Sequence, residues 1–403
     1  MHTSDPRHLI VIRAKGKAGA GHGRANGAFC APTDATRAPN VTSNATHLRL
    51  FSAITLTPAG LLALAGLAGG GWVWAALIYM TALTYGLDRV LRLGLQNAPE
   101  GAEFPASDRL LVALGVAHFV LFLLAVMAVS GQMALTTAER IGAFFAFGLY
   151  FGQVSNSAAH ELIHRGARPL HQLGRWMYIW QLFGHHASAH PLIHHRWVAT
   201  PRDPNSARFG ENVYAFACRA WVGSFRAGLQ AENARTARAS TQKPMWQHPF
   251  VAYVLGAMLA LTLSWAFAGP AGMAAHLALA VYATFQLLIS DYVQHYGLQR
   301  APQGSGYEPV GPAHSWNARQ WFSGRLMLHA PRHSDHHAHP TRPYPALHID
   351  PPNAMPRLPH SLPVMGMIAL IPPLWRRSMD HRVGDWLPGG KLAAGTLPAD
   401  MAD

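Results

Sequence analysis

Histidine is the residue type whose number and spacing in this chain could do chemistry. The 403 residues include 25 histidines but only two cysteines, Cys30 and Cys218, so a metal site would have to be built from imidazole. His160 and His164 frame the sequence His-Glu-Leu-Ile-His. On a helix this spacing puts both rings on one face, where they can hold one metal ion. Zinc metalloproteases carry the same pattern and use its glutamate, here Glu161, as general base.

Three further stretches extend the pattern to nine candidate metal ligands. Two of them hold three histidines each and the third holds one: His190, His194 and His195; His333, His336 and His337; and His295. Neighbouring histidines cannot share one helical face, so each His-His pair suits two metal ions, or one ion and an outer partner.

Nine imidazoles are too many for one catalytic zinc, which takes three protein ligands. The count fits two metal ions with four or five nitrogens each. Zinc, copper, nickel and iron all accept imidazole, so ligand type leaves the metal open. Because only neutral imidazole binds a metal, loading should fail as the pH falls below the histidine pKa range.

The elements that position these histidines are expected to be membrane helices. Half of the residues are hydrophobic and 13% are charged, which is about half the charged fraction of a soluble protein. A helix needs about 20 apolar residues to cross about 30 Å of hydrocarbon. Six segments approach that length, at about 50–70, 72–91, 110–129, 141–159, 250–267 and 273–290. We therefore predict an all-α integral membrane protein of about six transmembrane helices with a histidine-rich di-metal region.

The distribution of Arg and Lys predicts the orientation. The links near Gly70, Thr136 and Pro270 are short and nearly free of Lys and Arg, whereas the opposite face receives many, including Arg89 and Arg165. By the positive-inside rule the histidine-bearing face is cytoplasmic. The net charge of +13 is explained by this orientation, so we expect no nucleic-acid partner.

These predictions divide the chain into six stretches. They are a disordered basic leader (1–47), transmembrane helices 1–4 (48–160), a cytoplasmic region with the first and second histidine boxes (161–248), transmembrane helices 5–6 (249–291), a cytoplasmic region with the third box (292–385), and a C-terminal tail (386–403). The weaker apolar stretches 176–184 and 362–375 are interpreted as interfacial or re-entrant pieces.

The boxes and their flanks resemble the bacterial alkane 1-monooxygenases of the membrane fatty-acid desaturase and hydroxylase superfamily. The resemblance rests on residues 160–165, 198–204, 292–298, 332–342 and 372–377, and covers most of 50–385. Two positions depart from the family pattern, which commonly has Glu where this chain has Ala189 and Gln294. The segment Gln-His-Tyr-Gly-Leu is also similar to xylene-type monooxygenases, which hydroxylate aromatic methyl groups.

The resemblance implies a bacterial inner-membrane enzyme whose nine histidines hold two non-haem iron ions facing the cytoplasm. It implies hydroxylation of the terminal methyl of medium-chain n-alkanes to primary alcohols with O2. Electrons would come from rubredoxin, which an NAD(P)H-dependent rubredoxin reductase supplies. Four polar residues are candidates to orient the imidazole N–H groups, with helix capping as the alternative: Glu161, Asp203, Gln294 and Asp335.

An apolar substrate could enter from the bilayer through a cavity between helices. Side chains of the second segment could line it, although packing between helices is the alternative for each: Trp74, Tyr79, Met80 and Tyr85. Several other functions stay open from the residues. They are an aromatic-methyl hydroxylase, a fatty-acyl desaturase or hydroxylase, an intramembrane zinc protease that uses the first box, and a membrane electron carrier that binds haem through paired histidines.

Overall fold

The structure is a computed structural model that describes residues 41–91, 97–99, 101–239 and 244–387, with side chains from Ala45 onward in the first helix. All of them lie in one compact unit, Pro39–Asp403. The predicted leader falls outside the described residues up to residue 40, and so does the predicted tail from residue 388.

The first two predicted segments form a helical hairpin. Helix α1 spans Val41–Ala68, so it begins inside the stretch predicted as a disordered leader (1–47). The apolar pattern could not show this, because the first turns of α1 are polar. Gly69 and Gly70, both at positive φ, make the turn. The return helix comprises α2 (Gly71–Ile78), a π-helical turn η1 (Tyr79–Leu83) and α3 (Thr84–Val90).

The second pair of helices follows the same plan. Helix α4 (Ser107–Ser130) ends at Gly131 in the left-handed conformation. Thr136 then caps α5 (Thr137–Tyr150) in a capping box with Glu139, and the helix continues through the π-turn η2 (Phe151–Ser155) into α6 (Asn156–Ile163). Glu139 also accepts a hydrogen bond from the Gly70 N–H at 2.8 Å. Both interhelical turns therefore lie together at one end.

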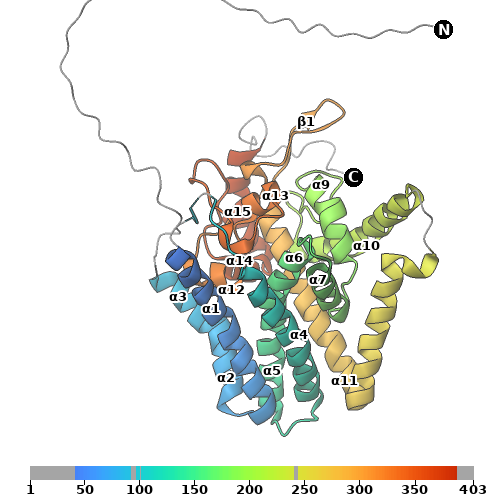
Figure 1. The fold of residues 1–403 in the computed structure, drawn as a ribbon. Helices are drawn as coiled ribbons and strands as arrows, with labels where there is room; N and C mark the ends of the chain where they lie inside the picture. Colours follow the sequence, from blue (N-terminus) through green and yellow to red (C-terminus); the bar gives the residue numbers. More distant parts are fainter. Residues whose placement is uncertain (1–40, 92–96, 100, 240–243, 388–403) are drawn as a thin grey trace, which may run out of the picture. The chain divides into compact units, whose positions relative to one another are not determined.

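Helix α11 (Pro249–His295) is a hairpin of two helices rather than one rod. Its backbone leaves helical geometry at Ala268 and Gly269, where Gly269 has φ of 62°. Figure 1 shows the two arms meeting at the same end as the turns α1–α2 and α4–α5. The second arm runs to His295, five residues beyond the predicted sixth span. His295 thus lies on the last turn of the helix rather than after it. The apolar pattern stops earlier because residues 291–295, which include polar side chains, are buried inside the protein and do not face lipid.

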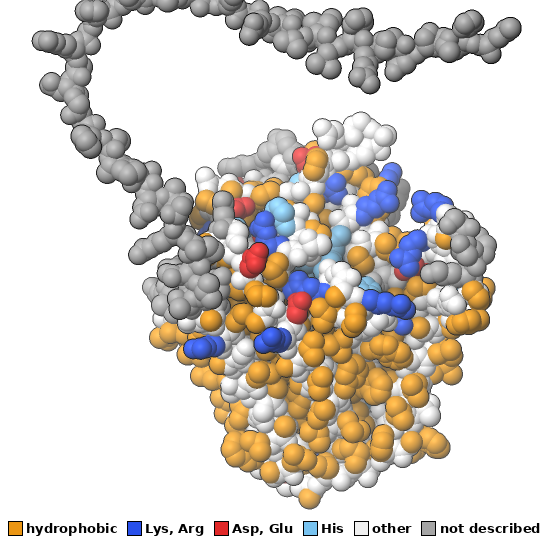
Figure 2. Space-filling view, viewed as in Figure 1, with side chains coloured by type: hydrophobic (Ala, Val, Ile, Leu, Met, Phe, Trp, Pro, Cys, Tyr) orange, Lys and Arg blue, Asp and Glu red, His pale blue; other side chains and the backbone are white. Residues whose placement is uncertain are grey.

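The membrane prediction is supported by three helical segments long and apolar enough to span a bilayer, at Ala45–Ala68, Ser107–Ser130 and Pro249–His295. The last contains both arms of the hairpin. Helical runs also occupy the predicted segments 72–91 and 141–159, each interrupted by a π-turn. Figure 2 shows a broad apolar zone on the side of the three turns, with Arg, Asp, Glu and His gathered at the other end. The chain is a helical membrane protein; the count of six spans stays a prediction.

The remaining elements, apart from the long helix α10, are short. Between α6 and α11 lie α7 (Arg168–Trp180), α8 (His186–Ala189), the π-turn η3 (His190–His194), α9 (His195–Trp197), α10 (Val213–Ala237) and η4 (Met245–Gln247). After α11 come β1 (Pro302–Gln303), β2 (Gly306–Tyr307), η5 (Pro312–His314), α12 (Trp321–Leu326), α13 (His333–Ala338), η6 (Tyr344–Ala346), α14 (Leu362–Ala369), α15 (Pro372–Val383) and η7 (Gly384–Trp386). Strands β1 and β2 form a two-residue antiparallel hairpin that the all-α prediction did not include.

Candidate metal centre

The nine predicted histidines come together in two groups. The first group comprises His160, His164, His190, His195 and His336, and the second comprises His194, His295, His333 and His337. Within each group, one ring nitrogen from every residue lies within 4.8 Å of the others. The second group is buried throughout, whereas three residues of the first are partly exposed.

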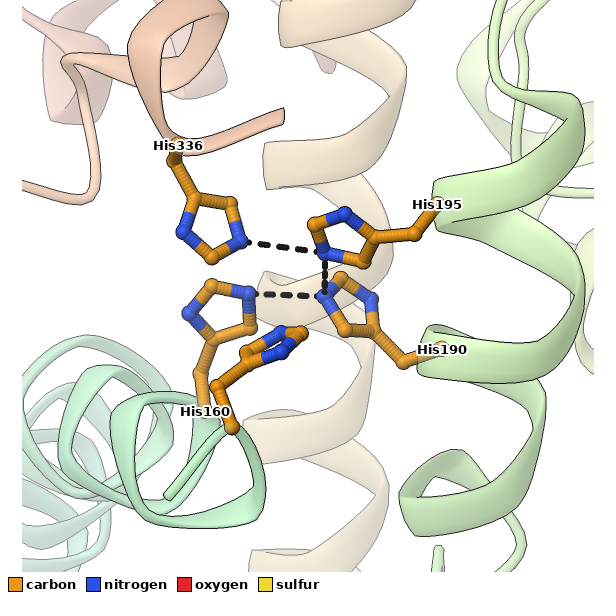
Figure 3. A group of neighbouring side chains, drawn as sticks. His160, His190, His195 and His336 are labelled. Carbon is orange, nitrogen blue, oxygen red and sulfur yellow. Dashed lines mark hydrogen bonds between the residues drawn. The ribbon is translucent and has the colours of Figure 1, made fainter. Parts of the chain in front are cut away.

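The first group is shaped to bind a cation. His190 Nε2 lies 2.8 Å from His160 Nε2 and 2.9 Å from His195 Nε2, and His195 Nε2 lies 3.1 Å from His336 Nε2 (Figure 3). One imidazole nitrogen has a single proton or a single lone pair, so these contacts cannot all be hydrogen bonds. Two nitrogens bound to one ion at about 2.1 Å are separated by about 3.0–3.4 Å, close to the 2.8–3.1 Å seen here, so the spacing is near that of shared coordination.

The second group repeats this arrangement. His333 Nε2 lies 3.0 Å from His295 Nε2 and 3.1 Å from His337 Nε2. His194 Nε2 is buried and has no hydrogen-bond partner among the described residues. A buried ring nitrogen without a partner is costly unless something binds it. The donor set therefore fits a second cation.

Local helix geometry explains how the histidines divide. His160 and His164, four residues apart at the end of α6, lie in the same group, as do His333 and His337 on α13. Each adjacent pair is split: His194 and His195 belong to different groups, and so do His336 and His337. In the second box the turn η3 is π-helical and pairs residues five apart rather than four. His190 therefore falls in one group with His195, and His194 falls in the other.

Asp203 is the one predicted orienting residue that bonds a group histidine in the structure. The His194 Nδ1–H donates to Asp203 Oδ2 at 2.8 Å, which leaves His194 Nε2 free for a metal. Asp203 is held in turn by the Ser206 hydroxyl and the Asn205 N–H. Burial acts to lower the pKa of His194, but the Asp203 carboxylate outweighs it and raises that pKa.

The other three predicted orienting residues hold different parts of the fold. Glu161 accepts hydrogen bonds from the Arg165 guanidinium and the Tyr344 N–H. Asp335 accepts from Arg342, from the His339 ring and from the His348 N–H. Gln294 donates to the Ala330 carbonyl and accepts from Ser290. Each is beside a group histidine in sequence, but the side chain turns to a neighbouring segment instead.

Burial keeps the remaining ring nitrogens in the form that binds metals. For His164, His190, His195, His333, His336 and His337, burial and then the neighbouring imidazoles lower the pKa well below its usual range. These side chains are therefore neutral at pH 7.

Two spaces lead to the groups. An inner chamber of about 50 Å³ is lined by His160 and His190 of the first group and His333 of the second. Beside it lies an outer cavity of about 470 Å³ between η1, η2, α11 and α14. Of the predicted cavity residues, Met80 and Tyr85 line the outer cavity. Trp74 does not line this cavity and packs near Gly142 instead. Tyr79 does not line it either, and its hydroxyl donates to the Ile54 carbonyl.

Sequence reasoning missed three residues near the groups. His186 and Asp291 line the inner chamber, and the Asn205 amide donates to Asp291 at 2.7 Å, which joins Asp291 to the Asp203 network. Asp291 could have been found as a carboxylate that ends a long apolar segment. His186 could have been found from its spacing, because it lies four residues before His190, as His160 does before His164.

Comparison with known proteins agrees with this site. The model of the fatty acid desaturase family matches residues 135–369, which include all nine histidines. An alkane 1-monooxygenase of Alcanivorax borkumensis is 33% identical over 341 residues, 79% of this chain and 80% of that protein.

Two further relatives come from Pseudomonas putida. An alkane 1-monooxygenase is 34% identical over 264 residues, 64% of each protein, so this match covers less than two thirds of the relative's length. The hydroxylase component of a xylene/toluene monooxygenase is 27% identical over 314 residues, 76% of this chain and 81% of that component.

The fold and the site together define a helical membrane protein with a histidine-built candidate metal centre. The two groups also disfavour a zinc protease, because the first-box histidines lie with three others and Glu161 is bound to Arg165. The chain belongs to the fatty acid desaturase family and, within it, is related to the alkane 1-monooxygenases.

Proposed function

We propose that this chain is a membrane-bound alkane 1-monooxygenase with two iron ions. It would hydroxylate the terminal methyl of medium-chain n-alkanes with O2 and electrons from rubredoxin. The observation that carries the proposal is that an apolar cavity adjoins a small chamber lined by histidines of both groups.

In this proposal the first and second groups each hold one iron ion, with five and four nitrogens. A strong C–H bond offers neither an acidic proton nor a leaving group, so a redox metal must supply the oxidant, and bound iron would do so by reductive activation of O2. The chain's own residues would orient the metal ligands and shield the site from water. Asp203 orients His194, and burial of the second group excludes water.

The outer cavity favours a neutral hydrocarbon over a charged one. No Asp, Glu, Lys or Arg lines it within the described part of the chain, and its walls include Phe285, Ile289 and Leu362. A fatty-acid carboxylate would be desolvated there without a partner, at a cost of several kcal/mol. This argues for an alkane and against a free fatty acid as substrate.

Aromatic methyl compounds are the second candidate substrates. The likeness to the xylene/toluene monooxygenase component favours them, and such molecules are also neutral. Substrate size and shape would then decide between the two.

The test uses membrane vesicles that contain the full chain, with rubredoxin, its reductase, NADH, n-octane and isotope-labelled O2. We expect labelled 1-octanol and about two irons per chain. Octene would indicate a desaturase, and product from p-xylene alone would indicate an aromatic-methyl hydroxylase. Zinc without iron, and no oxygenated product, would refute the proposal.

We also propose that the chain is a multi-pass protein of the bacterial inner membrane with its histidine face in the cytoplasm. Cys218 offers the test, because its thiol is exposed on helix α10. In a Cys30→Ser background, an impermeant thiol reagent should label inverted vesicles and spare intact spheroplasts. Labelling of spheroplasts would reverse the orientation.

A further inference from the structure

The outer cavity and the inner chamber meet at a neck of three residues, Gly152, Ser290 and Met327, which line both spaces. A molecule that passes from the cavity to the histidine groups by this route must pass these side chains.

Two sides of the neck are small and fixed. Gly152 lies in the π-turn η2, and a Cβ there would overlap the Gln286 amide, which donates to the Gly148 carbonyl at 2.8 Å. The Ser290 hydroxyl donates along its own helix to Gln294 at 2.9 Å. Neither side chain can widen or narrow the passage appreciably.

Met327 forms the third side and differs from both. It is the only long side chain of the three, and only 5% of it is exposed. An unbranched thioether is flexible and fills irregular gaps, so it can turn aside for a narrow chain.

The backbone around Met327 is held in an unusual conformation. Leu328 and His329 follow it with φ of 48° and 56°, a region that residues other than glycine rarely adopt. The His329 N–H donates to the Gly324 carbonyl at 2.7 Å, and the Ala330 N–H donates to the Met327 carbonyl at 2.9 Å. Such strained turns persist where the surroundings enforce them and are frequent at functional sites.

We propose that Met327 is a specificity-determining gate that admits an unbranched alkyl chain and holds back ring-bearing hydrocarbons. This inference rests on the proposed function. It adds that the neck selects the shape of the substrate, whereas the apolar outer cavity selects only its polarity.

The test is a competition between n-octane and p-xylene in vesicles that contain the full chain and the electron donors. The wild-type chain should favour 1-octanol. Met327→Ala should raise the ratio of aromatic alcohol to 1-octanol by roughly tenfold, since one or two methylenes in a pocket discriminate by that order. Met327→Phe should slow octanol formation.

Met258→Ala is the matched control, because Met258 is 58% exposed and lines neither the outer cavity nor the chamber. It should keep the wild-type product ratio. If Met327→Ala lacks wild-type iron content, Met327→Val removes less volume and carries the same expectation.

The outcomes separate the two proposals. A wild-type chain that makes no octanol would overturn the proposed function and the gate with it. Octanol formation with an unchanged ratio in the Met327 variants, or an equal change in Met258→Ala, would overturn the gate alone.

Discussion

Asp203 and Glu161 are both buried carboxylates near the histidine groups, but only Asp203 accepts a hydrogen bond from a group histidine. Its bond to His194 Nδ1 selects the tautomer whose Nε2 faces the second group. The negative carboxylate also raises the basicity of the imidazole, so it should strengthen metal binding at Nε2.

Asp203→Asn should therefore weaken iron binding by roughly 10–100-fold, the usual effect of losing such a partner. Iron retention against increasing chelator measures it. Asp335→Asn is the control, since Asp335 bonds Arg342 and His339 and no group histidine. Equal iron loss in both variants would contradict the assigned role of Asp203.

His336 tests ligation in the first group. Its ring nitrogen lies 3.1 Å from that of His195, so His336→Ala should lower iron content and abolish hydroxylation. His360→Ala replaces an exposed histidine outside both groups and should leave iron content and activity as in the wild type. Normal iron loading in His336→Ala would remove His336 from the proposed ligands.

The hairpin of α11 is the element that brings His295 to the second group. Its two arms approach so closely that a Cβ at Gly272 would overlap the Ser264 carbonyl. The hairpin is also joined by the Ser264 hydroxyl and His276, whose ring nitrogens contact Ser264 and the Trp180 carbonyl.

Gly272→Ala should destabilise the fold by about 1–3 kcal/mol, the usual cost of overpacking. Thermal unfolding in detergent measures it. Gly60→Ala is the matched control, because a Cβ there meets nothing within 4 Å, and alanine favours a helix over glycine. A midpoint that falls equally in both variants, or in neither, would argue against close packing at Gly272.

The assembled polar end buries many histidines in the neutral form, and this should make the metal-free chain sensitive to acid. In the unfolded chain a histidine has a pKa of about 6.5, whereas burial lowers the pKa of six group histidines well below that value. Below pH 6.5 the unfolded chain takes up protons that the folded chain refuses, so stability falls. His194, whose pKa is raised, acts in the opposite direction.

The thermal midpoint of the metal-free protein should therefore fall steadily from pH 7 to pH 5, because six lowered groups outweigh the one raised group. Unfolding scans after chelation measure it. A midpoint that is constant or rises over this range would show that these rings are not buried in the neutral form.

Much of this architecture follows from short-range sequence patterns. Apolar length predicts the membrane helices, since a helix must satisfy its own backbone in lipid. Spacing also predicts that His160 and His164 act together, because it places both rings on one helical face. For each His-His pair it predicts only that the two rings point apart, toward two metals or toward one metal and an outer partner. The start of α1 at Val41 and the extension of α11 to His295 escaped the pattern, because both stretches are largely polar; residues 291–295 are buried in the folded chain.

The partners of the side chains depend on segments far apart in the chain. Glu161 turns to Tyr344, 183 residues away, and the neck joins residues from η2, α11 and the turn after α12. No local pattern encodes such contacts, because they depend on how helices pack and not on how each one forms. Histidine type and spacing thus predict that two metals could bind, whereas packing decides which rings gather in each group, which carboxylate bonds one of them and which cavity adjoins them.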